Sequence, residues 1–343
     1  MTTVGVLGAT GAVGQRFVQL LDGHPEFEVS VLTASPQSAG DSYSEAAKWR
    51  LDTPIPDGIA ETTVRETDPD EIPGDTDLLF SALPSTVAEQ VEPELCEAGF
   101  VVSSNASNER VADDVPLVIP EVNADHLGLI DVQQDERGWD GALVKNPNCS
   151  TITMVPTLAA IDSFGLERVH VSTLQAVSGA GYSGVTSMEI LDNVVPHIGG
   201  EATKMETESR KLLGEFTGAG VEWHDATVSA SCNRVPTLDG HLENVFAETD
   251  ADPAPGEVAD AFRAADPIDL PSAPTPLIEV FEEPDRPQPR LDRMVGDGMA
   301  VAAGGVESTE TGVQYNCLAH NTVRGAAGAS ILNGELLASE GWL

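Results

Sequence analysis

The stretch TTVGVLGATGAVGQRFVQLLDGH, residues 2–24, decides the fold. Its apolar start, residues 2–10, predicts a strand, and residues 11–24 carry the apolar spacing of a helix. Between them GATGAVG, Gly8 to Gly14, places glycines at GxxGxxG spacing, which permits a tight turn and close backbone approach to a phosphate at a helix start. The stretch predicts a dinucleotide-binding strand–turn–helix, although glycines at such a turn also serve packing alone.

The second predicted strand, residues 27–35, bears on which dinucleotide is bound. Sites for NAD usually place an acidic residue about 20 residues after the loop, to bind the ribose 2′-hydroxyl. Here LTASPQSAG supplies Ser35, Gln37 and Ser38 but no carboxylate until Asp41. The sequence therefore favours NADP over NAD, without an arginine or lysine in this stretch to hold the 2′-phosphate.

The remaining pattern predicts an α/β chain of two domains. Strands at 77–84 and 100–105 flank a helix at 86–98, which indicates a Rossmann-type parallel sheet. After residue 148 the rhythm changes to an α+β domain with a largely antiparallel sheet; its elements are a helix at 150–162 and strands at 168–179, 224–236 and 241–249. We expect domains at 1–148 and 149–320, solvated loops with one short helix at 251–290, and a final helix at 322–337 that returns to the first domain, so that 321–343 completes it.

Composition excludes several classes of partner. The 343 residues carry 56 acidic and 17 basic side chains, a formal charge of −39, which disfavours binding to nucleic acid or anionic membranes. High carboxylate density with only four lysines indicates a halophilic source, where screening over roughly 3 Å in molar salt makes such self-repulsion tolerable. No apolar run reaches membrane-spanning length and no signal peptide is evident, so a cytoplasmic location is expected. The four cysteines lie far apart without metal-ligand spacing, so neither disulfides nor a metal site are expected.

Cys149 is the candidate nucleophile. In VKNPNCSTIT, residues 144–153, a polar, proline-led bend precedes an apolar run, which places the thiol in the first turn of a helix. Helix N–H groups there are expected to lower the thiol pKa; the alternative is a buried structural cysteine. Among seven histidines, His241 stands out because it follows the turn LDG and lies seven residues after Arg234. An ordinary strand-end histidine is the alternative.

Six motifs in order extend this interpretation: GATGAVGQ, VPLVIPEVN (115–123), NPNCST, QAVSGAGYSG (175–184), CNRVPTLDGH and NTVRGAAGAS. Together they resemble the aspartate-β-semialdehyde dehydrogenase family, and most of all its archaeal branch, over residues 4 to 335. The resemblance implies reduction of L-aspartyl 4-phosphate by NADPH to L-aspartate 4-semialdehyde and phosphate through a cysteine thioester, in lysine, threonine and methionine biosynthesis. It also implies a homodimer or homotetramer built through the second domain.

The resemblance assigns roles to residues. Cys149 is the nucleophile, His241 the general base and Gln175 the partner of the reacting carbonyl. Arg234 and Glu201 hold the substrate's α-carboxylate and amino group, and Arg110 and Lys204 hold its phosphate. The implied NADP-binding residues are Gly8, Thr10, Gly11, Ala12, Val13, Ser35, Ser38, Ser178, Gly179 and Asn321.

Other interpretations remain. The two arginines could be surface ion-pair partners, Asn321 a helix cap, and Glu201 with Lys204 an i,i+3 pair. N-acetyl-γ-glutamyl-phosphate reductase shares the cysteine chemistry but typically has NPGCY where this chain has NPNCS. Malonyl-CoA reductase of some archaea could share nearly every motif, although a CoA substrate needs no phosphate pocket. A non-catalytic dinucleotide sensor is the alternative outside enzymes.

Overall fold

The computed structural model describes residues 1–265 and 267–343. Its first sheet is six-stranded and entirely parallel, in the order β3-β2-β1-β4-β5-β6. The strands are β1 (Thr2–Leu7), β2 (Phe27–Ala34), β3 (Arg65–Glu66), β4 (Leu78–Ser81), β5 (Val101–Ser104) and β6 (Ala142–Lys145). The accompanying helices are α1 (Ala12–Leu21), α2 (Tyr43–Ala46), α3 (Asp57–Ala60), η1 (Pro69–Glu71), α4 (Ser85–Glu97), α5 (Pro120–Asn123), η2 (Ala124–Gly128) and α6 (Leu129–Arg137).

The second sheet is mixed, in the order β10-β7-β11-β14-β13-β12, with three antiparallel and two parallel pairings. Its strands are β7 (Leu166–Gln175), β10 (Thr227–Arg234), β11 (His241–Thr249), β12 (Ile278–Phe281), β13 (Val301–Ser308) and β14 (Gly312–Ala319). The other elements are α7 (Cys149–Ile161), η3 (Asp162–Phe164), η4 (Val177–Ala180), α8 (Ser187–Ile190), α9 (Glu201–Leu212), the hairpin β8 (Glu215–Phe216) and β9 (Val221–Glu222), α10 (Pro255–Arg263), α11 (Pro289–Asp292), η5 (Val295–Gly298), the π-helical turn η6 (Val323–Ala327) and α12 (Gly328–Ser339).

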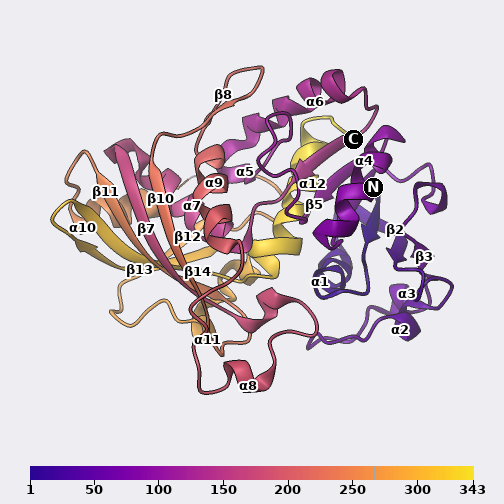
Figure 1. Cartoon of the computed structure of the whole chain (residues 1–343), viewed down its shortest axis with the longest axis horizontal. Helices are drawn as coiled ribbons and strands as arrows, with labels where there is room; N and C mark the ends of the chain where they lie inside the picture. Colours follow the sequence, from indigo (N-terminus) through magenta and orange to yellow (C-terminus); the bar gives the residue numbers. More distant parts are fainter. Residues whose placement is uncertain (266) are drawn as a thin grey trace.

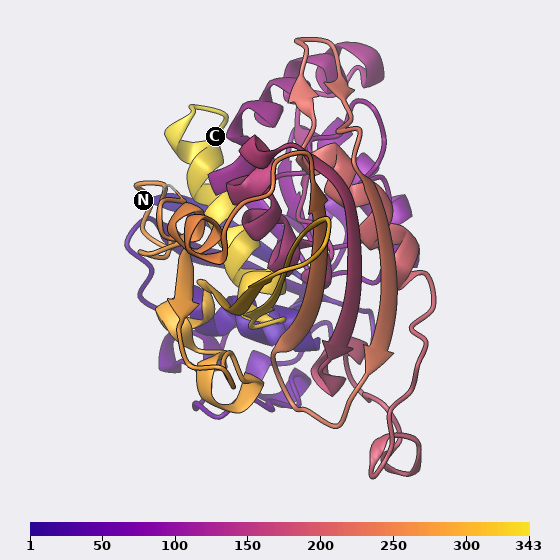
Figure 2. The ribbon, with the colours of Figure 1, turned by 90° about the vertical axis from the view of Figure 1, so that its left-hand side faces the viewer.

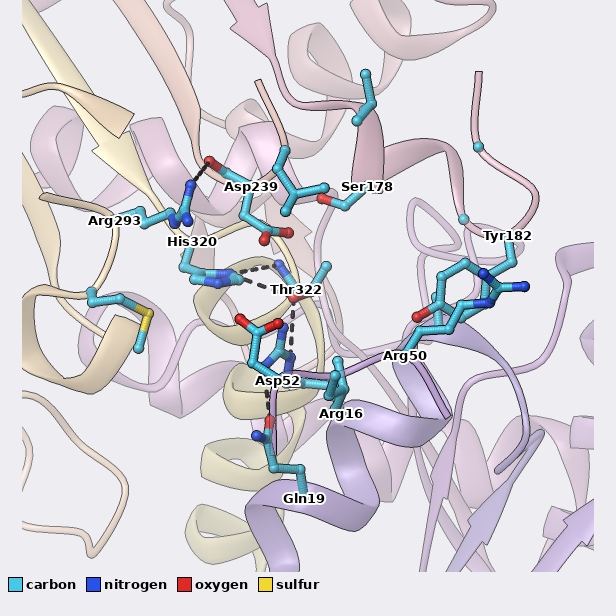
Figure 3. A pocket seen from close by; sticks show the side chains of 17 residues that line it. Arg16, Gln19, Arg50, Asp52, Ser178, Tyr182, Asp239, Arg293, His320 and Thr322 are labelled. Atoms are coloured by element: carbon cyan, nitrogen blue, oxygen red, sulfur yellow. Dashed lines mark hydrogen bonds between the residues drawn. The ribbon is translucent and has the colours of Figure 1, made fainter. Parts of the chain in front are cut away.

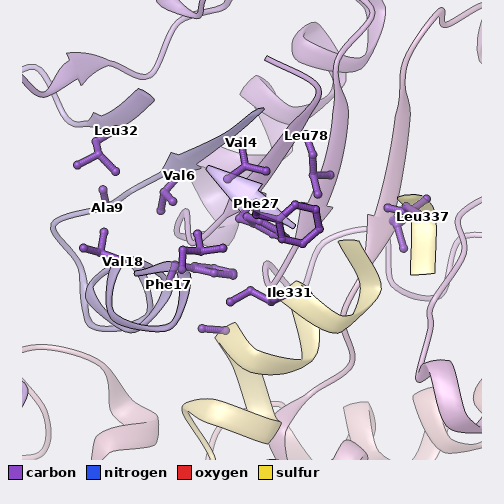
Figure 4. Packing of buried hydrophobic residues seen from close by; sticks show 14 of the residues in the cluster. Val4, Val6, Ala9, Phe17, Val18, Phe27, Leu32, Leu78, Ile331 and Leu337 are labelled. Carbon is purple, nitrogen blue, oxygen red and sulfur yellow. The ribbon is translucent and has the colours of Figure 1, made fainter. Parts of the chain in front are cut away.

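These sheets form the two lobes of the molecule, with α12 against the first (Figure 1). Ile331 and Leu337 of α12 join a core with Val4, Phe17 and Phe27 (Figure 4). Burying each such side chain contributes roughly 2 kcal/mol relative to leaving it in water. The predicted fold class is thus confirmed, including the return of the C-terminal helix to the first lobe.

One predicted segment is wrong in part. Residues 251–290 were expected to be solvated loops around one short helix, but they also contain β12, which pairs with β13 and buries Ile278. Proline, aspartate and alanine dominate this segment, so the four strand residues IEVF leave little pattern to detect. Residue 266 of this segment lies outside the described residues.

One face of the second sheet packs on α7 and α10, while strands β7, β10 and β11 present their other face uncovered (Figure 2). Side chains alternate along these strands, so residues such as Phe246, 45% exposed, point outward. Within the described residues, no helix is long and apolar enough to cross a membrane.

Candidate active site

Three predicted site residues meet at one end of the second sheet. Strand β7 lies between β10 and β11, and it ends at Gln175, which is in register with Arg234 at the end of β10. Strand β11 runs antiparallel and begins at His241, whose successor Leu242 pairs with Leu174. The seven-residue spacing of Arg234 and His241 could not place them on one face, but their separate strands bring them to the same edge.

Cys149 begins α7 and faces His241. The N-cap Asn148 accepts hydrogen bonds from the amides of Ser150 and Thr151, at 2.9 and 3.3 Å, so the helix start is fixed. The Cys149 Sγ lies 3.3 Å from His241 Nε2. The Ala176 amide donates to Nδ1 of the same ring at 3.1 Å, so in the neutral ring the single proton is on Nε2, toward sulfur.

The expected lowering of the Cys149 pKa is wrong for the ligand-free protein. Burial raises the pKa of the thiol to about 12, and the carboxylate of Glu201 adds to this, while Arg110 and Arg234 act in the opposite direction. Burial, with Arg234, lowers the pKa of His241 to about 3. Burial therefore keeps both the thiol and the imidazole neutral.

Gln175 and Arg234 end the two strands beside this pair. Gln175 is 1% exposed, and neither side-chain amide atom has a hydrogen-bond partner. Such a buried group is costly unless a ligand satisfies it. Arg234 Nη1 donates to the Ala176 carbonyl at 2.7 Å. A Cβ on Gly179 would lie 2.9 Å from Arg234 Nη1 and 3.2 Å from His241 Nε2, so only glycine fits there without a shift.

Helix α9 supplies Glu201 and Lys204. Glu201 Oε1 accepts from the Asn148 side-chain amide at 3.0 Å, and Lys204 Nζ lies 3.6 Å from Glu201 Oε2, so the i,i+3 pair considered from the sequence does form. Arg110 is buried rather than at the surface. It pairs with Glu208, also on α9, at 3.0 Å. Sequence reasoning missed Glu208, whose only signal is its spacing of seven residues from Glu201.

A cavity of about 600 Å³ gathers most of the predicted residues. Its lining includes Cys149, Arg110, Lys204, Gly11, Ala12, Val13, Ser178, Gly179 and Asn321. A second cavity of about 560 Å³ continues from Gly11 and is lined by Gly8, Thr10 and Ser35. The predicted residues outside both linings are Ser38, His241, Gln175, Arg234 and Glu201, of which Arg234 lines a separate cavity. Two carboxylates that lie after the stretch LTASPQSAG in the sequence, Glu66 and Asp68, also line the second cavity.

A third cavity, of about 500 Å³, adjoins the first and shares Ser178 and Tyr182 with it (Figure 3). Three arginines, Arg16, Arg50 and Arg293, line it beside two aspartates. Because the two cavities share lining residues, they are neighbours. The Arg50 guanidinium lies over the Tyr182 ring, 5.0 Å from its centre.

Asn321 and Gly325 join the C-terminal segment to the site. Asn321 Nδ2 donates to Ser178 Oγ at 2.8 Å, and its Oδ1 accepts from the Gly240 amide at 2.8 Å, so it links two loops and does not cap the helix. Gly325 was not predicted as a site residue. A Cβ there would lie 2.7 Å from the Cys149 Cβ, so a glycine allows η6 to approach Cys149. No described group of three His, Cys, Asp or Glu side chains is placed to hold a metal ion.

Comparison with known proteins places this geometry in a family. Residues 3–130 match the family "Semialdehyde dehydrogenase, NAD binding domain" and residues 158–324 match "Semialdehyde dehydrogenase, dimerisation domain". The aspartate-semialdehyde dehydrogenase of Archaeoglobus fulgidus is 52% identical over 98% of both chains. The chain belongs to the aspartate-semialdehyde dehydrogenase family. That of Methanothermobacter thermautotrophicus is 54% identical over 98% of this chain and 99% of the relative.

Solved structures of the aspartate-semialdehyde dehydrogenase family share the whole fold. The Candida albicans enzyme, solved with NADP, superimposes with a TM-score of 0.90 at 38% identity over 100% of both chains. The Vibrio cholerae enzyme II, solved with ASA, gives a TM-score of 0.78 at 28% identity over 99% of this chain and 98% of its own. The family predicted from the sequence is thus confirmed.

Proposed function

We propose that the chain reduces L-aspartyl 4-phosphate to L-aspartate 4-semialdehyde with NADPH and releases phosphate. The observation that carries this proposal is the 3.3 Å contact between Cys149 Sγ and His241 Nε2 beside a cavity lined by the glycine loop and two cations, Arg110 and Lys204. A thiol, an imidazole, a dinucleotide loop and cations for a leaving phosphate are the groups that reduction of an acyl phosphate requires.

The residues present fit NADP. The free N–H groups at the start of α1 suit a pyrophosphate. Gly14 has no room for a Cβ, because the glycine loop lies tight against the helix there. In this proposal Ser35, which lines the second cavity, binds the ribose, and Ser178 and Gly179, which line the first, lie beside the nicotinamide, which would supply the hydride. Ser38 stays a prediction. A relative solved with NADP supports this choice.

Cys149 performs the covalent step. Its sulfur attacks the acyl carbon, the C–S bond forms, and the C–O bond to phosphate breaks, with Arg110 and Lys204 offsetting the charge of the leaving dianion. The proton of the thiol leaves with the phosphate. The Gln175 amide, which has no other partner, donates to the carbonyl oxygen of the substrate. The His241 Nε2–H group faces the sulfur and the carbonyl oxygen of the acyl group bound to it. In the reverse direction His241 acts as the base only in the tautomer protonated at Nδ1, which the Ala176 N–H contact opposes.

Arg234 and Glu201 orient the substrate. The planar guanidinium offers paired donors to the α-carboxylate, and the Glu201 carboxylate pairs with the amino group. Because Glu201 raises the pKa of Cys149, pairing it with the substrate's ammonium group favours the thiolate when substrate is bound.

The domain roles, the self-association and the location of the protein belong to the same proposal. Residues 1–148 with 321–343 bind the cofactor, and residues 149–320 carry catalysis and self-association as a homodimer or homotetramer, for which the uncovered face of β7, β10 and β11 offers a surface. A cytoplasmic location and a halophilic source agree with the composition, −39 in net charge.

Malonyl-CoA reduction is the second candidate. Two cations, Arg110 and Lys204, line the cavity beside Cys149, where a thioester substrate would bring no phosphate to the reacting carbon. The site therefore favours the acyl phosphate. Asn148, which caps the nucleophile's helix, stands where N-acetyl-γ-glutamyl-phosphate reductases typically have glycine.

The reverse reaction tests the proposal. Aspartate semialdehyde and phosphate are incubated with NADP or NAD in high salt, and reduced nicotinamide is followed by absorbance. We expect oxidation that requires phosphate and is faster with NADP. Malonyl-CoA with NADPH is the control substrate; faster turnover of malonyl-CoA, or oxidation without phosphate, would contradict the assignment.

A further inference from the structure

Helix α9 presents four charged side chains on one face. Glu201, Lys204, Glu208 and Lys211 are spaced three, four and three residues apart, which aligns them along the helix. The proposed function uses the first two. Glu208 and Lys211 are only 2% and 1% exposed, and neither has a role in that function.

Each oxygen of the Glu208 carboxylate has a different partner. Oε1 accepts from Arg110 Nη1 at 3.0 Å, and Oε2 accepts from the backbone amide of Asn148 at 2.6 Å. One carboxylate therefore joins the cation proposed for phosphate to the residue directly before Cys149. Hydrogen bonds to a carboxylate in a buried site are among the stronger ones in proteins.

Lys211 holds the other end of the same segment. Its ammonium group donates to the carbonyls of Arg110, Ala112 and Val115, at 3.1, 2.6 and 2.7 Å. Arg110 Nη2 also donates to the Asn105 carbonyl at 2.7 Å. Nε of the same guanidinium has no hydrogen-bond partner among the described residues, and protein atoms cover it.

We infer that Glu208 is a positioning residue, which fixes the Arg110 guanidinium relative to the Cys149 thiol and so sets the separation between the phosphate site and the nucleophile. The inference rests on the proposed function. A purely structural ion pair would need no contact with the Asn148 amide, and a buried ion pair adds little net stability because desolvation offsets its attraction. The second oxygen's contact is what couples the cation to the nucleophile.

Glu208→Gln is the first variant, with Glu206→Gln on the same helix as the matched control. The amide oxygen of Gln can still accept from Asn148, but its NH₂ group opposes the Arg110 donors. In the phosphate-dependent reverse assay we expect the KM for phosphate to rise and kcat/KM for phosphate to fall roughly 10- to 100-fold, as misplacement of a reacting group predicts. The KM for NADP should stay within twofold.

Two further variants separate the geometry of the Glu208 carboxylate from its charge: Glu208→Asp, and Glu208→Gln combined with Arg110→Ala. Aspartate keeps the charge but is one methylene shorter and cannot reach both partners, so it should reproduce the loss. In an Arg110→Ala background, Glu208→Gln should no longer raise the KM for phosphate, because the two residues act on the same step. An undiminished effect in that background, a lower KM for phosphate, or parameters within twofold of wild type would overturn the inference.

Alkylation of Cys149 in the ligand-free protein distinguishes this outcome from a failure of the proposed function. Glu208→Gln removes a negative charge held by the Asn148 amide, directly before Cys149, which favours the thiolate wherever Arg110 lies. Iodoacetamide should therefore modify the folded Glu208→Gln variant several-fold faster at pH 8, and Glu206→Gln at the wild-type rate. Absence of phosphate-dependent oxidation in the wild type would reject the function alone. An unchanged alkylation rate would reject the positioning role.

Discussion

At the scale of single residues, the site holds a nucleophile that is not yet ionised. The sequence placed Cys149 at a helix start and predicted a lowered pKa from that, because the apolar surroundings that raise it come from strands and helices distant in the chain. The neighbouring imidazole is neutral as well. In the proposed function, activation of the thiol is linked to a substrate ammonium group that pairs with Glu201.

This state predicts an alkaline dependence for Cys149 in the ligand-free protein. Since only the thiolate reacts and burial raises the pKa to about 12, the alkylation rate should climb about tenfold per pH unit from pH 7 to 10. Iodoacetamide labelling followed by mass spectrometry measures it, with Cys149→Ser as the control because the other three cysteines are buried. A plateau near pH 8.5, the value of a free thiol, would contradict the prediction. Glu201→Gln should raise the rate.

Arg234 gives a prediction about substrate affinity. Arg234→Lys keeps the charge but loses the planar paired donors, so the KM for aspartate semialdehyde should rise about 10- to 50-fold, the cost of one charge-assisted hydrogen bond. Arg168→Lys is the matched control, because Arg168 is an exposed arginine on β7. Steady-state kinetics measures both, and a near wild-type KM for Arg234→Lys would mean that this arginine does not contact the carboxylate.

The charge of Glu66 should limit the preference for NADP over NAD. It lines the cavity that contains Ser35, so its charge opposes a 2′-phosphate there. Removing one exposed like charge contributes about 0.5 kcal/mol, so Glu66→Gln should lower the Kd for NADP roughly two- to threefold and leave that for NAD unchanged. Fluorescence titration with both nucleotides measures this. The exposed Glu61→Gln is the control, and equal changes for both nucleotides would exclude a specific effect.

At the scale of elements, β7, β10 and β11 convert distant sequence positions into one site. Strands β1, β2, β4 and β5 and helices α1 and α4 were predictable from their apolar periodicity, whereas β3, β6 and α6 were not predicted. Cys149 and His241 stood out from their local sequence, and the roles of Gln175 and Arg234 came from the motif resemblance. Spacing could not show that β7 separates Arg234 from His241, since strand order depends on the packing of the whole sheet. Glu208 and Gly325 were missed because a buried carboxylate and a close-packed glycine have no local sequence signature.

A substitution at Gly325 should show how strongly kcat depends on the packing of η6 against Cys149. Gly325→Ala would place its Cβ 2.7 Å from the Cys149 Cβ, so α7 or η6 must shift. Because a shift of about 1 Å can cost roughly 100-fold in rate, kcat should fall by 10- to 100-fold while the KM for NADP changes little. Gly256→Ala in α10, where the added methyl has no neighbour within 4 Å, is the control. Unchanged kcat in the folded Gly325→Ala variant would show that the contact relaxes without moving the thiol.

At the scale of the whole molecule, self-repulsion sets the conditions for stability. A chain with 56 acidic and 17 basic residues carries −39 charges, and compaction brings these charges together in the folded state more than in the unfolded chain. The described ion pairs are few relative to the carboxylates, since only 17 side chains are permanently cationic. Dissolved salt must therefore screen the excess, and its Debye length falls from about 10 Å at 0.1 M to about 3 Å at 1 M.

This argument predicts that KCl stabilises the fold steeply. The free energy of unfolding should rise between 0.1 and 1 M KCl, because repulsion between charges about 10 Å apart is screened over that range. Urea unfolding followed by circular dichroism at a series of KCl concentrations measures the change. Sucrose at matched osmolality is the control, since it strengthens burial without screening charge. Equal stability in dilute buffer and in 1 M KCl would exclude a halophilic adaptation, and an equal gain in sucrose would assign the effect to solute exclusion from the surface.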